Sequence, residues 1–164
     1  MNSPHANDSQ SEKLANSYRI EIKEAMKIES QKRTNENHDP KEISRLQNIS
    51  LIELHNNSDE ELVPALMARL GVVRSALDGH GGSIIVESSE LEKLNNGKLS
   101  LSLILNLDGA CISCGAAPGT LQGIQDDLLF DPEIISVRFS ASMLEWFSEL
   151  QRDFILKHGG VTFA

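Results

Sequence analysis

A regular alternation of apolar and polar residues between positions 99 and 107 is the clearest pattern in the chain. Successive side chains of a β-strand point to opposite faces of its sheet, so this pattern predicts a strand with one buried, leucine-rich face. The other face carries smaller and more polar residues, and we expect it to be more open. The predicted buried face consists of Leu99, Leu101, Leu103, Leu105 and Leu107, and the open face of Ser100, Ser102, Ile104 and Asn106.

Two further segments are predicted to be strands. Residues 83–87 (SIIVE) form a short apolar run, and the Asn96-Gly97 pair predicts a turn between this run and the leucine strand. Residues 134–139 form the third strand, because Pro132 ends the connection that precedes it. The sequence therefore predicts a sheet of three strands.

Helical periodicity is present on both sides of these strands. The segment 12–32 has apolar residues four positions apart on a charged background, which predicts a helix. A second helix begins with Asp39 as its cap and Pro40 in its first turn, and Glu42 has the spacing of a capping box. Further helices are predicted at 64–78, 118–129 and 141–157.

The order of these elements predicts the fold class. From residue 58 onward the order is helix, strand, strand, helix, strand, helix, which is typical of an α+β domain with a small mixed sheet and helices packed on one face. We expect this domain to span residues 58–164 and residues 1–57 to form a polar, helical N-terminal extension. The extension is either an arm that packs on the domain or a partner, or a solubilising and partly ordered leader.

The net charge of −9 is concentrated in the predicted domain. Residues 1–57 carry 8 basic and 9 acidic side chains, whereas residues 58–164 carry 7 basic and 15 acidic ones. An acidic surface repels nucleic-acid phosphates, so nucleic-acid binding is not expected. The chain has no run of 18 apolar residues and its first residues lack an apolar signal core, so we expect no membrane span and a cytoplasmic location.

The two cysteines of the chain, Cys111 and Cys114, follow the leucine strand directly. Thiols at this spacing can bind a metal, but they supply only two of the four ligands that a zinc or iron–sulfur site usually needs. The helix predicted after them favours the thiolate form through its dipole. These residues alone leave four uses open: an iron–sulfur cluster, a redox dithiol, a shared zinc ion, and no chemistry. No nucleotide-binding loop or hydrolase motif is present, so an enzyme is not expected.

An ordered set of motifs around the cysteines resembles the NifU-like C-terminal domain family. The resemblance extends over roughly residues 60–140. The sequence departs from the family pattern at His80, where relatives usually carry aspartate, and at 115–117 (GAA), where they commonly carry Pro-Ser-Ser. The matching motifs are Pro64, Gly81-Gly82, Gly109-Ala110-Cys111-Ile112-Ser113-Cys114, Thr120-Leu121 and Pro132-Glu133-Ile134 followed by Val137.

This resemblance implies an iron–sulfur cluster scaffold or carrier. Domains of this family bind a labile [4Fe–4S] cluster between two subunits and transfer it to apo-proteins, with [2Fe–2S] as the other cluster form. The resemblance implies that Cys111 and Cys114 are the metal ligands and that the protein is a homodimer. It also implies that apo iron–sulfur recipients and upstream assembly factors are its partners. The alternative function is a thiol–disulfide oxidoreductase that uses the two cysteines as a redox pair.

His80 allows two interpretations. Imidazole is a good metal ligand, so this residue could complete a metal site. A histidine is also favoured at the C-terminal end of a helix, where the dipole attracts positive charge. The His-Gly-Gly sequence recurs at 158–160, again at a predicted helix end, and this recurrence favours the second interpretation.

Acidic and aromatic side chains outside the cysteine motif also allow more than one role. Asp126 and Asp127 either attract basic client proteins or belong to a solvated helix face. The aromatic residues of the last predicted helix are expected to lie in the core or at a dimer contact, with client docking as the other use. These aromatic residues are Trp146, Phe147 and Phe154.

Overall fold

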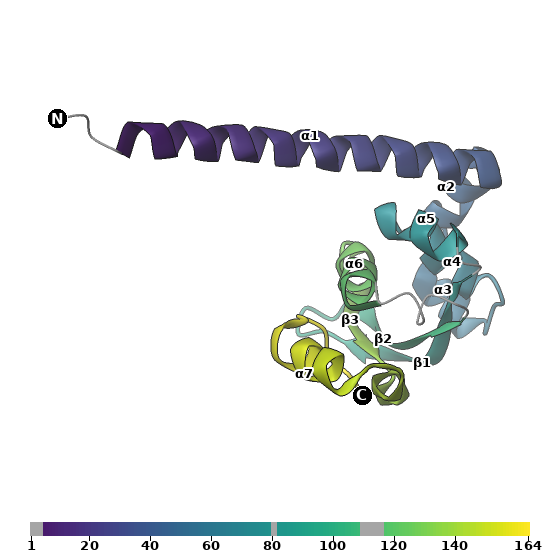
Figure 1. Cartoon of the computed structure of the whole chain (residues 1–164). Coiled ribbons are helices and arrows are strands. Elements are labelled where there is room, and N and C mark those ends of the chain that lie inside the picture. The colour runs from purple at the N-terminus through teal and green to yellow at the C-terminus, as the bar shows by residue number, and fades with distance from the viewer. Residues whose placement is uncertain (1–4, 80–81, 109–116) are drawn as a thin grey trace.

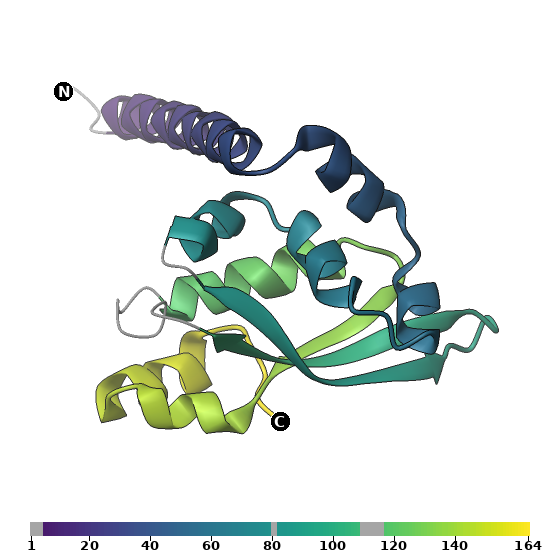
Figure 2. The same cartoon turned by 90° about the vertical axis from the view of Figure 1, so that its right-hand side faces the viewer.

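The computed structural model of the chain describes residues 5–79, 82–108 and 117–164. Figures 1 and 2 show a long helix, α1, that projects from a body built around a small twisted sheet. In chain order the elements are α1 (His5–Asn37), α2 (Pro40–Asn48), α3 (Leu51–Asn56), α4 (Leu62–Ala68), α5 (Val72–Gly79), β1 (Ser83–Lys93), β2 (Leu99–Asp108), α6 (Ala117–Leu129), β3 (Ile134–Phe139), the 3₁₀ helix η2 (Ala141–Trp146) and α7 (Glu149–His158).

The sheet has the strand order β1-β2-β3. β1 and β2 are antiparallel, and β2 and β3 are parallel, so the predicted α+β fold with a three-stranded mixed sheet is confirmed. Gly97 has a φ of 82°, which glycine adopts at little cost, and it forms the predicted turn between β1 and β2. β1 is longer than the predicted segment 83–87 because it pairs with β2 along its whole length, from Ser83 opposite Asp108 to Lys93 opposite Leu99.

The leucine face of β2 is the centre of the core. Leu101, Leu103 and Leu105 are fully buried and belong to the same core as the apolar side of α6, whereas Leu99 is 45% exposed, contrary to prediction. The opposite face is less open than predicted, since the side chains of Ser100 and Ser102 are buried. The sequence predicts helices on one face only, whereas Figures 1 and 2 show α6 on one side of the sheet and α7 on the other. The residues of α6 in this core are Leu121, Ile124 and Leu128.

The helix predicted at 64–78 is interrupted between α4 and α5. At the interruption, the backbone N–H of Gly71 donates to Oδ2 of Asp127 at 2.8 Å, a partner on α6 that local periodicity cannot reveal. The last predicted helix is likewise divided into η2 and α7, because Ser148 and Gln151 form a capping box that begins α7. Of the predicted aromatic cluster, Phe147 is buried but Phe154 is 56% exposed. Trp146 is 42% exposed.

The second predicted helix also consists of two pieces, α2 and α3. Asp39 caps α2 by accepting a hydrogen bond from the backbone N–H of Lys41, as expected. Glu42 does not complete a capping box; it pairs with Arg45, whose hydrogen bond holds the pKa of Glu42 below its ordinary value. The apolar side chains of α2 and α3 belong to the same core as the sheet, so the boundary predicted after Asn57 separates residues that pack together. These side chains are Ile43, Leu46, Leu51 and Leu54.

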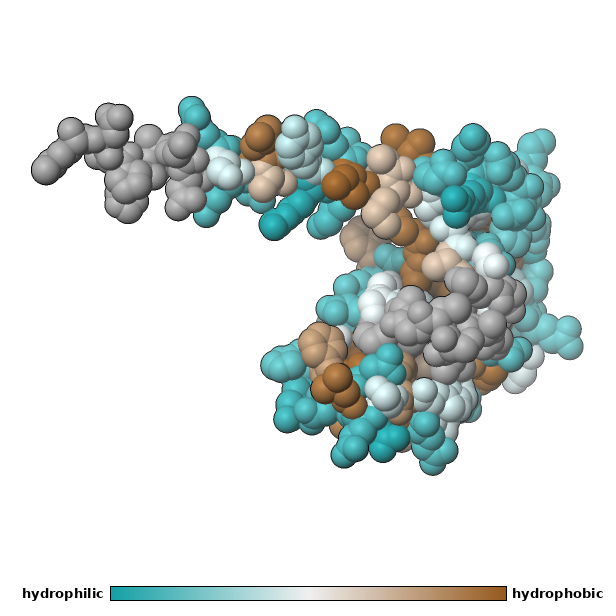
Figure 3. Space-filling model, in the orientation of Figure 1, coloured by the Kyte–Doolittle hydropathy of each residue, from teal (hydrophilic) through white to brown (hydrophobic). Residues whose placement is uncertain are grey.

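The helix α1 is in contact with the body only near its C-terminal end. There Ser30 and Thr34 are buried, and Ser30 accepts a hydrogen bond from the hydroxyl of Ser75 at 3.1 Å. His38, just beyond α1, lies 3.0 Å from the carboxylate of Asp78. Figure 3 shows apolar side chains at intervals along the projecting part of α1, which is consistent with an arm rather than a core helix. None of the helices that the structure describes has the length and apolar character needed to cross a bilayer.

Asp131 and Glu133, which follow α6 in the sequence, connect α2, α3 and α4 to the sheet. Asp131 accepts a hydrogen bond from Nε of Arg69 at 2.6 Å, and both side chains are largely buried. Glu133 accepts hydrogen bonds from the hydroxyl of Ser50 at 2.7 Å and from the backbone N–H groups at the start of α3. Both carboxylates thus hold helices that lie far from them in the sequence. The N–H groups bound by Glu133 belong to Leu51 and Ile52.

Replacement of Glu133 by glutamine is expected to lower the free energy of unfolding by about 1–2 kcal/mol. The substitution removes a negative charge from the positive end of α3 and turns one acceptor oxygen into a donor that faces N–H groups. Urea denaturation should show a lower midpoint with an unchanged slope. The control is Glu60→Gln, which removes the same charge from an exposed side chain; equal stability of the two variants would contradict the capping role of Glu133.

Candidate functional site

The predicted ligands Cys111 and Cys114, and also His80, lie outside the described residues. The elements on both sides of the cysteine segment are described. β2 ends at Asp108 and α6 begins at Ala117, so the strand end and the helix start predicted around the cysteines are both present. The structure thus describes β2 and α6, the two elements that flank the cysteine segment in the sequence and form the frame of the candidate site.

Asp108, which precedes the cysteines in the sequence, and Ser83, which follows His80, lie at the same end of the sheet. Ser83, the first residue of β1, pairs with Asp108, the last residue of β2. α5 ends at Gly79, and the N–H of Gly82 donates to the carbonyl of Leu77 at 2.8 Å, so α5 leads almost directly into β1. The sheet therefore places the start of β1 beside the end of β2, although the two lie far apart in the sequence.

The frame around the cysteine segment is firmly packed. The last inward side chain of β2, Leu107, is buried beside Ile84 of β1, its partner in the sheet. α6 contributes three fully buried side chains to the core. Asp127 binds the N–H of Gly71 and so links α6 to the start of α5, whereas Asp126 is exposed. Of the two predicted roles for this acidic pair, a solvated face describes Asp126, and Asp127 has a structural role that was not predicted.

The charge distribution at the start of α6 favours a negatively charged group. This helix has thirteen residues, and its first turn contains no acidic side chain. The aligned peptide dipoles of such a helix place partial positive charge at its N-terminus, next to the segment that carries the two cysteines. A thiolate is more stable in this field than in water alone, and a thiolate is the form that binds metals or attacks disulfides.

The second His-Gly-Gly sequence, residues 158–160, ends α7. The N–H of Gly159 donates to the carbonyl of Ile155 at 2.9 Å, and Gly160 has a φ of 67°. A Cβ atom at Gly159 would lie 2.5 Å from that carbonyl oxygen, so only glycine fits. At this copy of the motif the predicted helix end is present, with His158 in the last turn of α7, and the role of His80 stays a prediction.

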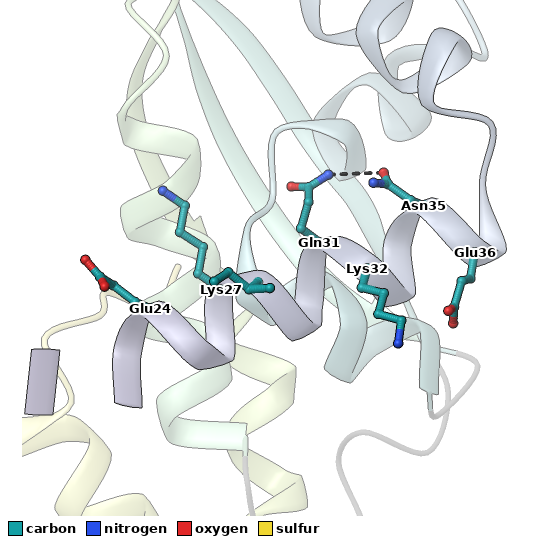
Figure 4. Close-up of a pocket in the computed structure, with 7 residues that line it drawn as sticks. Glu24, Lys27, Gln31, Lys32, Asn35 and Glu36 are labelled. Atoms are coloured by element: carbon teal, nitrogen blue, oxygen red, sulfur yellow. Dashed lines mark hydrogen bonds between the residues drawn. The ribbon is translucent and has the colours of Figure 1, made fainter. Parts of the chain in front are cut away.

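No other group of side chains in the described ranges has the composition of a metal site. In these ranges no three His, Cys, Asp or Glu residues are placed to hold a metal ion. All the described residues that line the hollow drawn in Figure 4 belong to α1, and Gln31 donates to Asn35 at 3.2 Å within it. Side chains that spread from one exposed helix do not enclose a ligand, so this hollow is the open flank of the arm.

Arg74 is a buried cation that the sequence analysis did not single out. It lies on α5 beneath α1, and its side chain is 8% exposed. The sequence around Arg74 indicates that this arginine is unusual. No other lysine or arginine occurs between positions 70 and 92, and Asp78 follows Arg74 by one helical turn. Burial of a charged side chain costs free energy unless a partner neutralises it. An isolated arginine in an apolar helix, with an aspartate one turn away, is therefore a candidate for a buried and functional cation.

No protein-family model, curated protein or solved structure matches the chain. The functional proposals below therefore rest on the residues of this chain and on the positions of the elements around them.

Proposed function

We propose that the protein is an iron–sulfur cluster scaffold or carrier. The observation that supports this most strongly is the position of the cysteine pair in the sequence between the end of β2 and the first turn of α6, within the order β-β-α-β. This order and position agree with the NifU-like motifs of the sequence. Cys111 and Cys114 are the proposed ligands, and the cluster is cargo that the protein passes on.

The number of cysteines per chain determines how many chains are expected to bind one cluster. A [4Fe–4S] or [2Fe–2S] cluster is usually held by four thiolates, and each chain has two. Two copies of the chain therefore provide a complete set, so we propose a homodimer with the cluster between the subunits. Thiolates of a recipient apo-protein can replace those of the scaffold one at a time, which makes the cluster transferable. Free thiols of this kind persist in a reducing compartment such as the cytoplasm.

Anaerobic reconstitution of the full chain with iron and sulfide tests this function. We expect about four iron and four sulfide per two chains, a Mössbauer spectrum of a [4Fe–4S] cluster, and a dimer in size-exclusion chromatography. About two iron and two sulfide per dimer would indicate the [2Fe–2S] form of the same function. A monomer that takes up no iron would contradict the proposal.

The position at a helix start also favours a thiol–disulfide oxidoreductase, since the same dipole would lower the pKa of a cysteine nucleophile. The two functions differ in a measurable way. An oxidoreductase would be a metal-free monomer that forms an intramolecular Cys111–Cys114 disulfide with a defined reduction potential. Mass spectrometry after equilibration in glutathione buffers measures that potential. The same disulfide in a protein that also assembles a stable cluster would favour the scaffold.

A further inference from the structure

A small cavity lies between α1, α2 and α5. Its volume is about 80 Å³. One water molecule needs roughly 10–15 Å³ of such space, so the cavity has room for a small polyatomic ligand. Lys27, Ser30 and Thr34 of α1 line one side of it, and Arg74 of α5 lines the other.

The guanidinium group of Arg74 is incompletely paired in this cavity. Its Nε and Nη1 atoms are buried and have no hydrogen-bond partner among the residues that the structure describes. The carboxylate of Asp78 is 3.6 Å from Nε, which is an ion-pair distance but too long for a good hydrogen bond. The same carboxylate oxygen is also 3.0 Å from Nε2 of His38, so Asp78 is shared between two groups. Buried N–H groups without a partner cost free energy, and an anion would provide that partner.

The lining of the cavity suits an anion. Its two charged residues, Lys27 and Arg74, are both cations, and no aspartate or glutamate is found among the described residues that line it. The hydroxyl of Thr34 can donate a hydrogen bond to a ligand in the cavity. The other polar lining side chains already donate within the protein: Ser30 to Val72, Gln31 to Asn35 and Gln47 to Ala68. A lining whose charged residues are both cations is unusual in a chain with a net charge of −9. The carboxylate of Asp78 beside Arg74 offsets one of these two positive charges, so the cations remain in excess at the site.

We propose that this cavity binds a tetrahedral oxyanion of the size of phosphate or sulfate. Arg74 binds the anion through its free N–H groups, and Lys27 and the hydroxyl of Thr34 bind it from α1. The bound anion then connects α1 to α5 and fastens the arm to the body. This proposal does not depend on cluster binding, and it is tested on protein that carries no cluster.

Titration of the full chain with inorganic phosphate, at constant ionic strength in chloride, tests the site. The Nε–Hε signal of Arg74 in a ¹H–¹⁵N spectrum should shift in a saturable manner, and sulfate should compete. Amide exchange at residues 30–37 should slow, because the anion holds this end of α1 against α5. Absence of any shift up to ~50 mM phosphate would overturn the proposal.

Variants of the two cations separate this site from weak binding elsewhere. Arg74→Met should weaken phosphate binding by at least about tenfold, since it removes charge-assisted hydrogen bonds. Lys27→Met should weaken binding by roughly twofold to fivefold, and its exposed position makes misfolding no concern. The matched control is Arg19→Met, an exposed arginine of α1 outside the cavity, which should leave binding unchanged. Equal effects of Lys27→Met and Arg19→Met would show that only general charge matters and would overturn the proposal.

Discussion

Replacement of Arg69 by methionine is expected to lower the free energy of unfolding by about 3–5 kcal/mol. The guanidinium of Arg69 donates to the carboxylate of Asp131 at 2.6 Å. It also donates to the carbonyl of Ile49 at 2.7 Å and to that of Leu46 at 2.9 Å, two groups at the C-terminal end of α2. The side chain of Arg69 is only 9% exposed, so water cannot take over these roles. Methionine fills the space but leaves a largely buried carboxylate and several carbonyls without a donor.

Urea denaturation of the variant and of two controls measures this effect. Arg33→Met removes an arginine that is 62% exposed and pairs only with Glu29, so it should change the free energy of unfolding by less than ~1 kcal/mol. The double variant Arg69→Met/Asp131→Asn should be more stable than Arg69→Met alone, because the unpaired charge is gone. A loss of less than ~1 kcal/mol in Arg69→Met would show that this hydrogen-bond network is not needed to hold α2 and α4 on β3.

The second large effect is expected at Cys111. Cys111→Ser should abolish cluster uptake, with iron and sulfide falling to the background of an unreconstituted sample. Each chain carries two cysteines, so this substitution leaves a dimer with two thiolates where an iron–sulfur cluster needs about four ligands. Serine has nearly the same size but is a poor ligand for iron in these clusters, because its hydroxyl stays protonated near neutral pH.

The controls for this prediction separate ligation from folding. Cys114→Ser should give the same loss, whereas Ser113→Ala, which changes one of the two residues between the cysteines, should take up iron like the unchanged protein. Far-ultraviolet circular dichroism and the urea midpoint of each variant show whether the fold is retained. Normal iron uptake by both cysteine variants would exclude Cys111 and Cys114 as ligands and would redirect the search to other side chains.

Elements that depend on neighbouring residues were predictable from the sequence. The alternation that ends at Leu107, the Asn96-Gly97 turn and the strand 134–139 all have the structure that local patterns indicate. Asp39 caps its helix for the same reason, since the side chain reaches an N–H only two residues away. In each case the energy that selects the structure comes from sterics or hydrogen bonds within a few residues.

The predictions that failed include features that depend on contacts between residues far apart in the sequence. The helix predicted at 64–78 is interrupted where Gly71 binds Asp127, which is 56 residues away in the sequence. The helix predicted at 141–157 is divided, because η2 ends at Trp146 and Ser148 caps the start of α7. A helical pattern shows which residues share a face, but it cannot show where a distant partner ends the helix or which face the body covers.

The features of the candidate site and its surroundings also fall into two groups, those set by local sequence and those set by tertiary contacts. The sequence by itself determined the two cysteines, their spacing, and the strand and helix on either side, because these are properties of one short stretch. Only the tertiary structure decided that the start of β1 pairs with the end of β2, that Glu133 and Arg69 hold the N-terminal helices, and that Arg74 is buried beneath α1. The physical reason is that burial and long-range hydrogen bonds exist only after the chain has folded, and they give each of these polar side chains its role.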